Sequence, residues 1–260
     1  MAAGAGIDIE GVTKRYGAAV AVDKVSLSVQ EGQFVALVGA SGSGKTTLLK
    51  TINRLVEPDD GVVRLGGEDV TQGDAALLRR RIGYVFQGVG LFPHLTVGEN
   101  IAVTPRLLGW SKADAAARVI ELLKLVDLPA DYAARRPDAL SGGQRQRVGV
   151  ARALAAKPKL MLMDEPFGAL DPVTRDILGG AYRKLHEELG LTTLMVTHDV
   201  QEALLLADRI VVMKAGRILA DDAPHALMRG HDNPDVEALI ATPRKQAERV
   251  RELMDRSEGA

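Results

Sequence analysis

The sequence contains no cysteine and no long uncharged apolar run. Because none of its 260 residues is a cysteine, the chain forms no disulfide and no thiolate metal site, which is consistent with a reducing compartment. No uncharged apolar run reaches the roughly 18 residues that a membrane-spanning helix needs. The N-terminal segment 1–17 has no basic stretch followed by an apolar run, so we expect no secretory signal there. We therefore expect that the chain itself does not cross a membrane.

The sequence also lacks a strong charge of either sign. Its 33 Lys and Arg residues nearly balance 34 Asp and Glu residues, and the formal net charge is −1. This balance provides no basic surface of the kind that binds nucleic acid, so we expect no nucleic-acid partner. Hydrophobic residues make up 46% of the chain, enough for one large domain or a core with an inserted subdomain.

A glycine-rich stretch, GASGSGKTT (39–47), lies between a predicted strand, QFVALV, and a predicted helix, TLLKTINRL, which carries Leu48, Ile52 and Leu55 at helical spacing. It matches the phosphate-loop pattern G-x-x-x-x-G-K-[ST], which a solitary glycine turn would match only by chance. Glycines let backbone N–H groups converge on phosphates, and the helix N-terminus adds partial positive charge. We predict that Lys45 contacts the β- and γ-phosphates of a nucleotide and that the Thr46 hydroxyl holds Mg²⁺. The predicted nucleotide contacts here are Gly39, Ala40, Ser41, Gly42, Ser43, Gly44, Lys45, Thr46 and Thr47.

A second apolar run, KLMLMDEP (159–166), ends in two carboxylates. It is typical of a buried parallel strand that delivers acidic side chains to the carboxyl edge of a sheet, where ligands bind in open α/β proteins. We predict that Asp164 contacts Mg²⁺ through its water shell and that Glu165 polarises the attacking water. Alone, the run could also be a strand that ends at a polar turn before Pro166.

The stretch LSGGQRQRVGVARALA (140–155) begins with the pattern of a helix capping box, Ser141 and Gln144, and continues with an apolar helix face. A capping box does not explain Gly142 and Gly143, each of which costs about 1 kcal/mol relative to alanine within a helix. Two glycines at a helix start let the phosphate of another molecule approach the backbone. The apolar face consists of Val148, Ala151, Leu154 and Ala155.

LSGGQ is the signature of the ATP-binding cassette (ABC) family, and the chain resembles that family over nearly its whole length. The resemblance implies an α/β fold: a RecA-like P-loop NTPase core with an N-terminal antiparallel β subdomain and an inserted α-helical subdomain. It implies one ABC ATPase domain over 1–260. Its expected parts are a core with the β subdomain at 1–87 and 157–222, a helical insertion with the signature at 88–156, and a short helical tail at 223–260.

The resemblance also implies roles for four further residues. Tyr16 in KRYG resembles the aromatic residue that stacks on adenine, although it could be an ordinary strand-end tyrosine. Gln87 in YVFQ resembles the glutamine that touches Mg²⁺ and the attacking water and relays contact with the membrane partner. Asp171 in GALD resembles the aspartate that crosses a dimer interface. His198 in LMVTHD resembles the histidine that holds the γ-phosphate.

The resemblance implies a set of partners as well. Two copies would form a head-to-tail homodimer on binding ATP, with the Ser141–Gln144 segment of one copy, Gly142 and Gly143 included, facing the nucleotide of the other. The dimer would sit at the cytoplasmic face of the membrane on transmembrane permease subunits, which receive solute from a binding protein. The expected catalytic residues are Lys45, Gln87, Glu165 and His198, and those expected to contact Mg²⁺ are Thr46, Gln87 and Asp164.

Three other segments predict secondary structure. VSLSV (25–29) alternates strictly, as in an antiparallel strand with one solvated face, and RIVVMKAGRILA (209–220) predicts a hairpin that turns at 214–216. SKADAAARVIELLKLVDL (111–128) predicts a helix capped by Ser111. It resembles the family's permease-docking subdomain, although it could also belong to a plain core helix pair. Its apolar face is predicted to contain Val119, Leu122, Leu123 and Val126.

Segment 90–112, with LFPHLTV and PRLLGW, resembles the ATPases of quaternary-amine (osmoprotectant) importers. Forty residues follow Ala220, too few for the regulatory domain pair of larger family members. They predict short helices, one with Thr242 as cap and Pro243 at its first position. An importer of amino acids or other polar solutes remains the alternative. A soluble DNA-repair or translation-factor cassette would need a coiled-coil insertion or two cassettes, and a non-hydrolysing clamp would lack Glu165 or His198.

Overall fold

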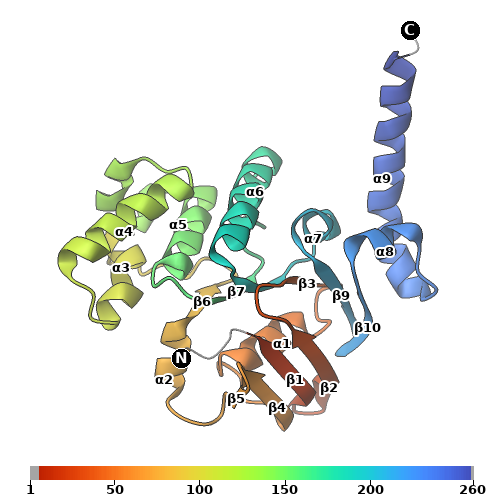
Figure 1. Ribbon diagram of the computed structural model, residues 1–260, viewed down its shortest axis with the longest axis horizontal. Helices are drawn as coiled ribbons and strands as arrows, with labels where there is room; N and C mark the ends of the chain where they lie inside the picture. Colours follow the sequence, from red (N-terminus) through yellow and green to blue (C-terminus); the bar gives the residue numbers. More distant parts are fainter. Residues whose placement is uncertain (1–5, 259–260) are drawn as a thin grey trace.

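The computed structural model describes residues 6–258 and contains two β-sheets (Figure 1). The four-stranded sheet has the order β2-β1-β4-β5, and its pairs are antiparallel. The six-stranded sheet has the order β10-β9-β3-β8-β7-β6, in which only the β10–β9 pair is antiparallel. The strands are β1 (Ile7–Tyr16), β2 (Ala19–Val29), β3 (Phe34–Val38), β4 (Asp60–Leu65), β5 (Glu68–Asp69), β6 (Ile82–Val85), β7 (Leu160–Asp164), β8 (Thr192–Val196), β9 (Arg209–Lys214) and β10 (Arg217–Asp222).

The central strands of the six-stranded sheet, β3, β7 and β8, are buried on both faces, which explains why they are continuous apolar runs rather than alternating ones. In β3 every residue is buried: Val35 and Leu37 pack in a core that also contains residues of the four-stranded sheet and of α1 (Lys45–Ile52). Phe34, Ala36 and Val38 face the opposite core, formed largely by helices. The sheet is therefore a middle layer.

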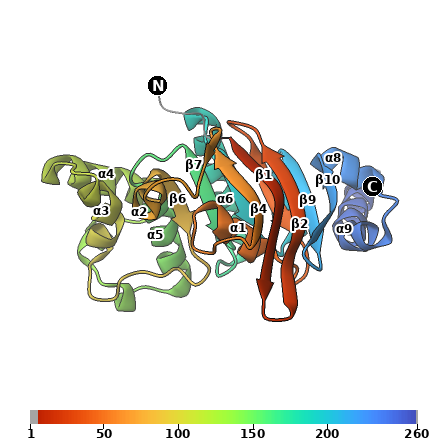
Figure 2. The same cartoon turned by 90° about the horizontal axis from the view of Figure 1, so that it is seen from below.

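The remaining helices flank the sheets (Figures 1 and 2). Because β6 and β7 are parallel neighbours, the chain between them must leave the sheet and return. This connection forms α3, α4 and α5 at one end of the molecule. Helices α8 and α9 lie at the other end, beyond β10. The helices are α2 (Ala75–Arg81), α3 (Val97–Leu107), α4 (Lys112–Leu125), α5 (Gly142–Leu154), α6 (Pro172–Leu189), α7 (Val200–Leu206), α8 (Pro224–Arg229) and α9 (Pro234–Glu258), with 3₁₀ turns at Ala130–Ala134 and Pro137–Ala139.

Several local predictions are confirmed. VSLSV forms the end of β2 and alternates between buried and exposed positions, and the hairpin turns between β9 and β10. Helix α4 begins after Ser111, whose Oγ accepts the Asp114 N–H at 3.1 Å, and its predicted apolar face is buried. Within residues 6–258, none of the helices is long and apolar enough to cross a lipid bilayer.

Two predicted helix boundaries are wrong. The helix after the glycine-rich stretch ends at Ile52, and Leu55 lies beyond it with 45% of its surface exposed. The predicted helix start at Thr242 and Pro243 is replaced by one continuous helix, α9, which begins nine residues earlier at Pro234. There Asn233 Oδ1 accepts the Asp235 N–H at 2.9 Å. The buried side chains Val236 and Ile240 anchor the helix, and this packing outweighs the hydrogen bond that Pro243 lacks.

Candidate functional site

The glycine-rich loop joins the end of β3 to α1, and two of its glycines are required by close packing. Gly39 and Gly44 have φ angles of 147° and 100°, a region that residues with a Cβ rarely adopt. A Cβ on Gly39 would lie 2.1 Å from the Met213 carbonyl oxygen, and one on Gly44 would lie 2.2 Å from that of Ala21. The backbone is thus held tightly against β9 and β2, and the turn is no flexible surface loop.

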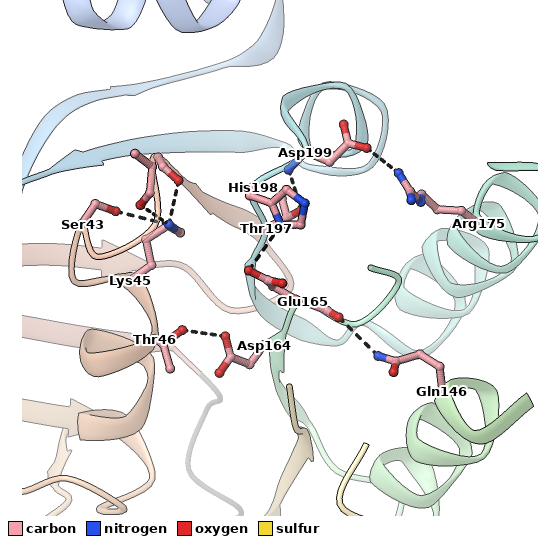
Figure 3. Close-up of polar contacts among 12 residues, drawn as sticks. Ser43, Lys45, Thr46, Gln146, Asp164, Glu165, Arg175, Thr197, His198 and Asp199 are labelled. Carbon is pink, nitrogen blue, oxygen red and sulfur yellow. Dashed lines mark hydrogen bonds and ion pairs between the residues drawn. The ribbon is translucent and has the colours of Figure 1, made fainter. Parts of the chain in front are cut away.

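The Lys45 ammonium is folded into this loop and is bonded only to neutral acceptors (Figure 3). Its Nζ donates to the carbonyl oxygens of Gly39 and Ala40 at 2.7 and 2.9 Å and to Ser43 Oγ at 3.2 Å. Burial lowers the pKa of Lys45, while the charges of Glu165 and Asp164 act in the opposite direction. A buried cation without a bonded carboxylate is well matched to an anion. The loop therefore fits a phosphate group.

Thr46 and Asp164 meet although they are far apart in the sequence. Asp164 ends β7, and its Oδ1 accepts the Thr46 hydroxyl at 2.8 Å (Figure 3). Burial raises the pKa of Asp164. The described residues contain no group of three His, Cys, Asp or Glu side chains able to hold a metal ion by themselves. Mg²⁺ commonly uses one or two protein oxygens and completes its shell with phosphates and water, so this oxygen pair fits Mg²⁺ bound with a nucleotide.

Glu165, the residue after Asp164, has a left-handed backbone with a φ angle of 49°. This conformation is unfavourable for a residue with a Cβ and persists only where surrounding contacts hold it. Its N–H donates to the Val196 carbonyl at 2.9 Å, and Gln146 Nε2 donates to its carbonyl at 3.2 Å. The carboxylate Oε1 lies 3.3 Å from Nδ1 of the exposed His198, which follows β8. An acid and an imidazole thus point toward each other beside the Thr46–Asp164 pair (Figure 3).

A second group of predicted residues, the segment 141–144, is exposed at Ser141 and Gly142 and half-buried at Gly143 and Gln144. Ser141 and Gln144 form the predicted capping box: Ser141 Oγ accepts the Gln144 N–H at 3.2 Å, and Gln144 Oε1 accepts the Ser141 N–H at 2.9 Å. A Cβ on Gly142 would meet only one side-chain atom, at 4.0 Å, so local packing does not require a glycine there. No hydrogen bond among the described residues joins the segment 141–144 to the glycine-rich loop.

The remaining predicted residues are at the edges of the elements. Tyr16 ends β1 and is 52% exposed, and Gln87 is exposed two residues beyond β6. Asp171 caps α6, its Oδ1 accepting the Thr174 N–H at 3.0 Å. This bond lowers the pKa of the Asp171 carboxyl. Asp171 is exposed, and no hydrogen bond among the described residues joins it or the 141–144 segment to the Lys45 ammonium.

Sequence reasoning missed three side chains near the site: Gln146, Arg175 and Asp199. Gln146 is 2% exposed and bonds to the carbonyls of Glu165 and Pro166. Arg175 pairs with Asp199 across 24 residues. The sequence carries no signal for these three, because the burial of Gln146 and the pairing of Arg175 with Asp199 arise only in the folded chain.

The family model described as "ABC transporter" matches residues 22–168 of the chain. The chain belongs to the ABC transporter family. It is an ATP-hydrolysing cassette with a RecA-like P-loop NTPase core. Its fold matches a solved structure, the dimeric post-hydrolysis state of the ATP-binding cassette MJ0796 bound to ADP and Pi, with a TM-score of 0.79 and 35% identity over 84% of this chain and 98% of that one.

Curated relatives are similar over most of the cassette. The glycine betaine/carnitine/choline transport ATP-binding protein OpuCA of Bacillus subtilis is 48% identical over 96% of this chain and 68% of its own length. The glycine betaine uptake system ATP-binding protein YehX of Escherichia coli is 50% identical over 85% and 72%. The sulfate/thiosulfate import ATP-binding protein CysA 2 of Shewanella oneidensis is 49% identical over 90% and 66%. The chain thus spans about two thirds of the length of these relatives.

Proposed function

We propose that the chain is the ATP-binding and ATP-hydrolysing subunit of an importer for quaternary-amine osmoprotectants such as glycine betaine or choline. The observation that carries the catalytic part is the convergence of Lys45, the Thr46–Asp164 pair and the Glu165–His198 contact at one edge of the six-stranded sheet. The similarity to OpuCA and YehX supports the solute class.

In the proposed mechanism the loop binds the nucleotide phosphates through its backbone N–H groups, and Lys45 turns from its carbonyl partners to the β- and γ-phosphates. Thr46 would hold Mg²⁺ and Asp164 would contact it through the water shell of the ion; when bound, the ion would neutralise charge on the phosphate oxygens. Glu165 accepts a hydrogen bond from the attacking water and polarises it. His198, 3.3 Å from that carboxylate, contacts the γ-phosphate.

Three exposed residues would complete the site around this core. Tyr16, at the end of β1, would stack on adenine, since its ring is accessible. Gln87 would contact Mg²⁺ and the attacking water, because it follows β6, whose neighbour β7 ends in Asp164. Asp171 would cross to a second copy of the chain.

The second group of residues is proposed to act in a homodimer. Ser141 and Gln144 are fixed by the capping box at the N-terminus of α5, and the exposed Gly142 leaves room for a phosphate beside the backbone N–H groups. A head-to-tail pair would place this segment of one copy against the nucleotide on the loop of the other. The dimeric form of the MJ0796 cassette supports this arrangement.

The helical region α3–α4 is the proposed docking surface for transmembrane permease subunits. Leu107 and Leu108, at the end of α3, are 55% and 45% exposed, and Phe92, before its start, is 43% exposed. In the proposal these apolar side chains contact the permease. This partner would hold the cassette at the cytoplasmic face of the membrane. A solute-binding protein would deliver solute to the permease.

An importer for another polar solute is the second candidate. It is favoured by the 49% identity to a sulfate/thiosulfate import ATP-binding protein, which is as high as the identity to the relatives named for betaine. The cassette does not touch the solute, so its own residues constrain the choice only through the segment that contacts the permease.

We predict that glycine betaine or choline stimulates ATP hydrolysis by the complete transporter and not by the cassette alone. The measurement is ATP hydrolysis in vesicles that contain the cassette, its operon's permease and the solute-binding protein, with quaternary amines compared with polar amino acids and sulfate. The cassette without permease is the control and should not respond. Stimulation by an amino acid or sulfate, with none by any quaternary amine, would contradict the solute assignment and leave the ATPase assignment standing.

A further inference from the structure

One guanidinium joins the two loops that carry Asp171 and His198. Arg175 lies in α6, four residues after the cap Asp171, and its Nη1 donates to Asp199 Oδ2 at 2.6 Å (Figure 3). Its Nη2 donates to the Leu170 carbonyl at 3.3 Å. Leu170 precedes Asp171 directly, and Asp199 follows His198 directly. Arg175 thus connects the proposed dimer-facing loop to the proposed γ-phosphate contact within one chain.

The residues on both sides of His198 are fixed by hydrogen bonds, whereas His198 itself is exposed. Thr197 donates its N–H to the Leu37 carbonyl at 3.1 Å, and its Oγ1 accepts the Asp199 N–H at 3.0 Å. Asp199 Oδ1 caps α7, accepting the N–H groups of residues 201 and 202 at 3.0 and 3.2 Å. The other carboxylate oxygen of Asp199 is the one that Arg175 holds. Within residues 6–258, the ion pair with Arg175 is thus the one hydrogen-bonded contact of Asp199 that reaches another helix, and Asp199 is the direct neighbour of His198.

One nitrogen of the Arg175 side chain lacks a hydrogen bond within residues 6–258, whereas Arg183, on the same helix, has a partner for every nitrogen type. Arg175 Nε is buried and has no hydrogen-bond partner among the described residues, which costs stability. Arg183 donates from Nε to Glu187 at 2.8 Å, from Nη1 to the Leu206 carbonyl at 2.8 Å, and pairs through Nη2 with Asp208 at 2.8 Å. All three kinds of nitrogen in the Arg183 guanidinium therefore have partners, as in a residue that stabilises the fold. In Arg175 the two terminal nitrogens bond to the two loops, and Nε has no partner in the part of the chain that the structure describes.

We propose that Arg175 is a positioning residue for ATP hydrolysis: its ion pair with Asp199 holds His198 against Glu165 and makes that contact depend on the position of the Asp171 loop. This inference rests on the proposed roles of His198, Glu165 and the homodimer. When a second copy contacts the Asp171 loop, Leu170 moves, and Arg175, which is bonded to both Leu170 and Asp199, moves Asp199 with it. This movement brings the neighbouring His198 imidazole into position against Glu165.

The test is steady-state ATP hydrolysis by the full chain with variants of the pair. Arg175→Gln is expected to lower kcat by about 10- to 100-fold, because small misplacements of reacting groups have effects of that size, while KM for ATP stays within about threefold. Asp199→Asn, which keeps the capping oxygen and loses the charge, is expected to lower kcat similarly. The double variant should be no slower than the slower single one, since both remove the same interaction. Arg175→Lys should recover part of the rate.

Arg183→Gln is the matched control. Arg183 has nearly the same side-chain exposure as Arg175, 27% against 28%, and also joins α6 to an aspartate near α7. Its loss should lower the melting temperature and leave kcat within about threefold of the unmodified chain. An equal fall in kcat for Arg183→Gln would overturn the proposal, and so would an unchanged kcat or a change confined to KM for Arg175→Gln.

The His198→Ala variant distinguishes failure of the proposed role of His198 from failure of the inference about Arg175. If His198→Ala hydrolyses ATP at the unmodified rate, the proposed role of His198 is wrong and the inference about Arg175 falls with it. If His198→Ala is inactive and Arg175→Gln is fully active, only the inference fails. Loss of activity in both, with Arg183→Gln active, is the result that we expect.

Discussion

Replacing Glu165 with glutamine is expected to lower kcat for ATP hydrolysis by about two to four orders of magnitude, the range of a removed general base. ATP binding should persist, because the loop, Lys45 and the Thr46–Asp164 pair stay in place. The amide keeps the shape of the carboxylate and loses its capacity to accept a proton. Single-turnover hydrolysis together with equilibrium ATP binding measures both effects.

Glu202→Gln is a matched control for that variant. Glu202 is a carboxyl of α7 that is 8% exposed, and burial raises its pKa to about 7. An amide resembles its protonated form, so this substitution should leave hydrolysis within about threefold of the unmodified chain. If Glu165→Gln also hydrolysed ATP within about threefold, the role assigned to Glu165 would be wrong.

Replacing Lys45 with alanine is expected to weaken ATP binding by about 10- to 100-fold, the value of one or two charge-assisted hydrogen bonds. The buried ammonium is the cation placed inside the loop, and its present partners are two carbonyls and a hydroxyl that phosphate oxygens would replace. Titration calorimetry with ATP and Mg²⁺ measures the dissociation constant, and circular dichroism checks the fold.

Lys50→Ala separates the loss of Lys45 from a general loss of positive charge. Lys50 lies on the same helix α1 and carries the same charge, and its removal should leave ATP affinity within about threefold. Unchanged affinity in a folded Lys45→Ala variant would show that the loop does not bind the phosphates in the proposed way.

Local sequence patterns predicted the elements whose causes are local. The β3 run, the glycine-rich loop and the Ser141–Gln144 capping box each depend on neighbouring residues, and the structure contains all three. The helix start predicted at Pro243 failed because the same local signal, a polar cap followed by proline, also occurs at Asn233, and buried contacts of Val236 decide between them.

The detailed geometry of the site could not be predicted, because it is made by contacts between distant residues. Thr46 meets Asp164 across 118 residues, and Gln146 reaches the carbonyl of Glu165 across 19. The resemblance to the ABC family named Thr46 and Asp164 as candidate residues, but it did not predict the contact between Gln146 and Glu165. The left-handed backbone of Glu165 has no sequence signal either, and its backbone groups bond to Val196 and Gln146, which are distant in the sequence.

We propose that the complete site forms between two copies of the chain, and ATP-driven dimerisation of the Glu165→Gln variant tests this most directly. Light scattering should show a particle of 27.7 kDa without nucleotide and one of about twice that mass in saturating MgATP, with return to the smaller mass in ADP, because only the γ-phosphate bridges the halves. Ser141→Arg should abolish the change without preventing ATP binding. A monomer in saturating MgATP would contradict the account.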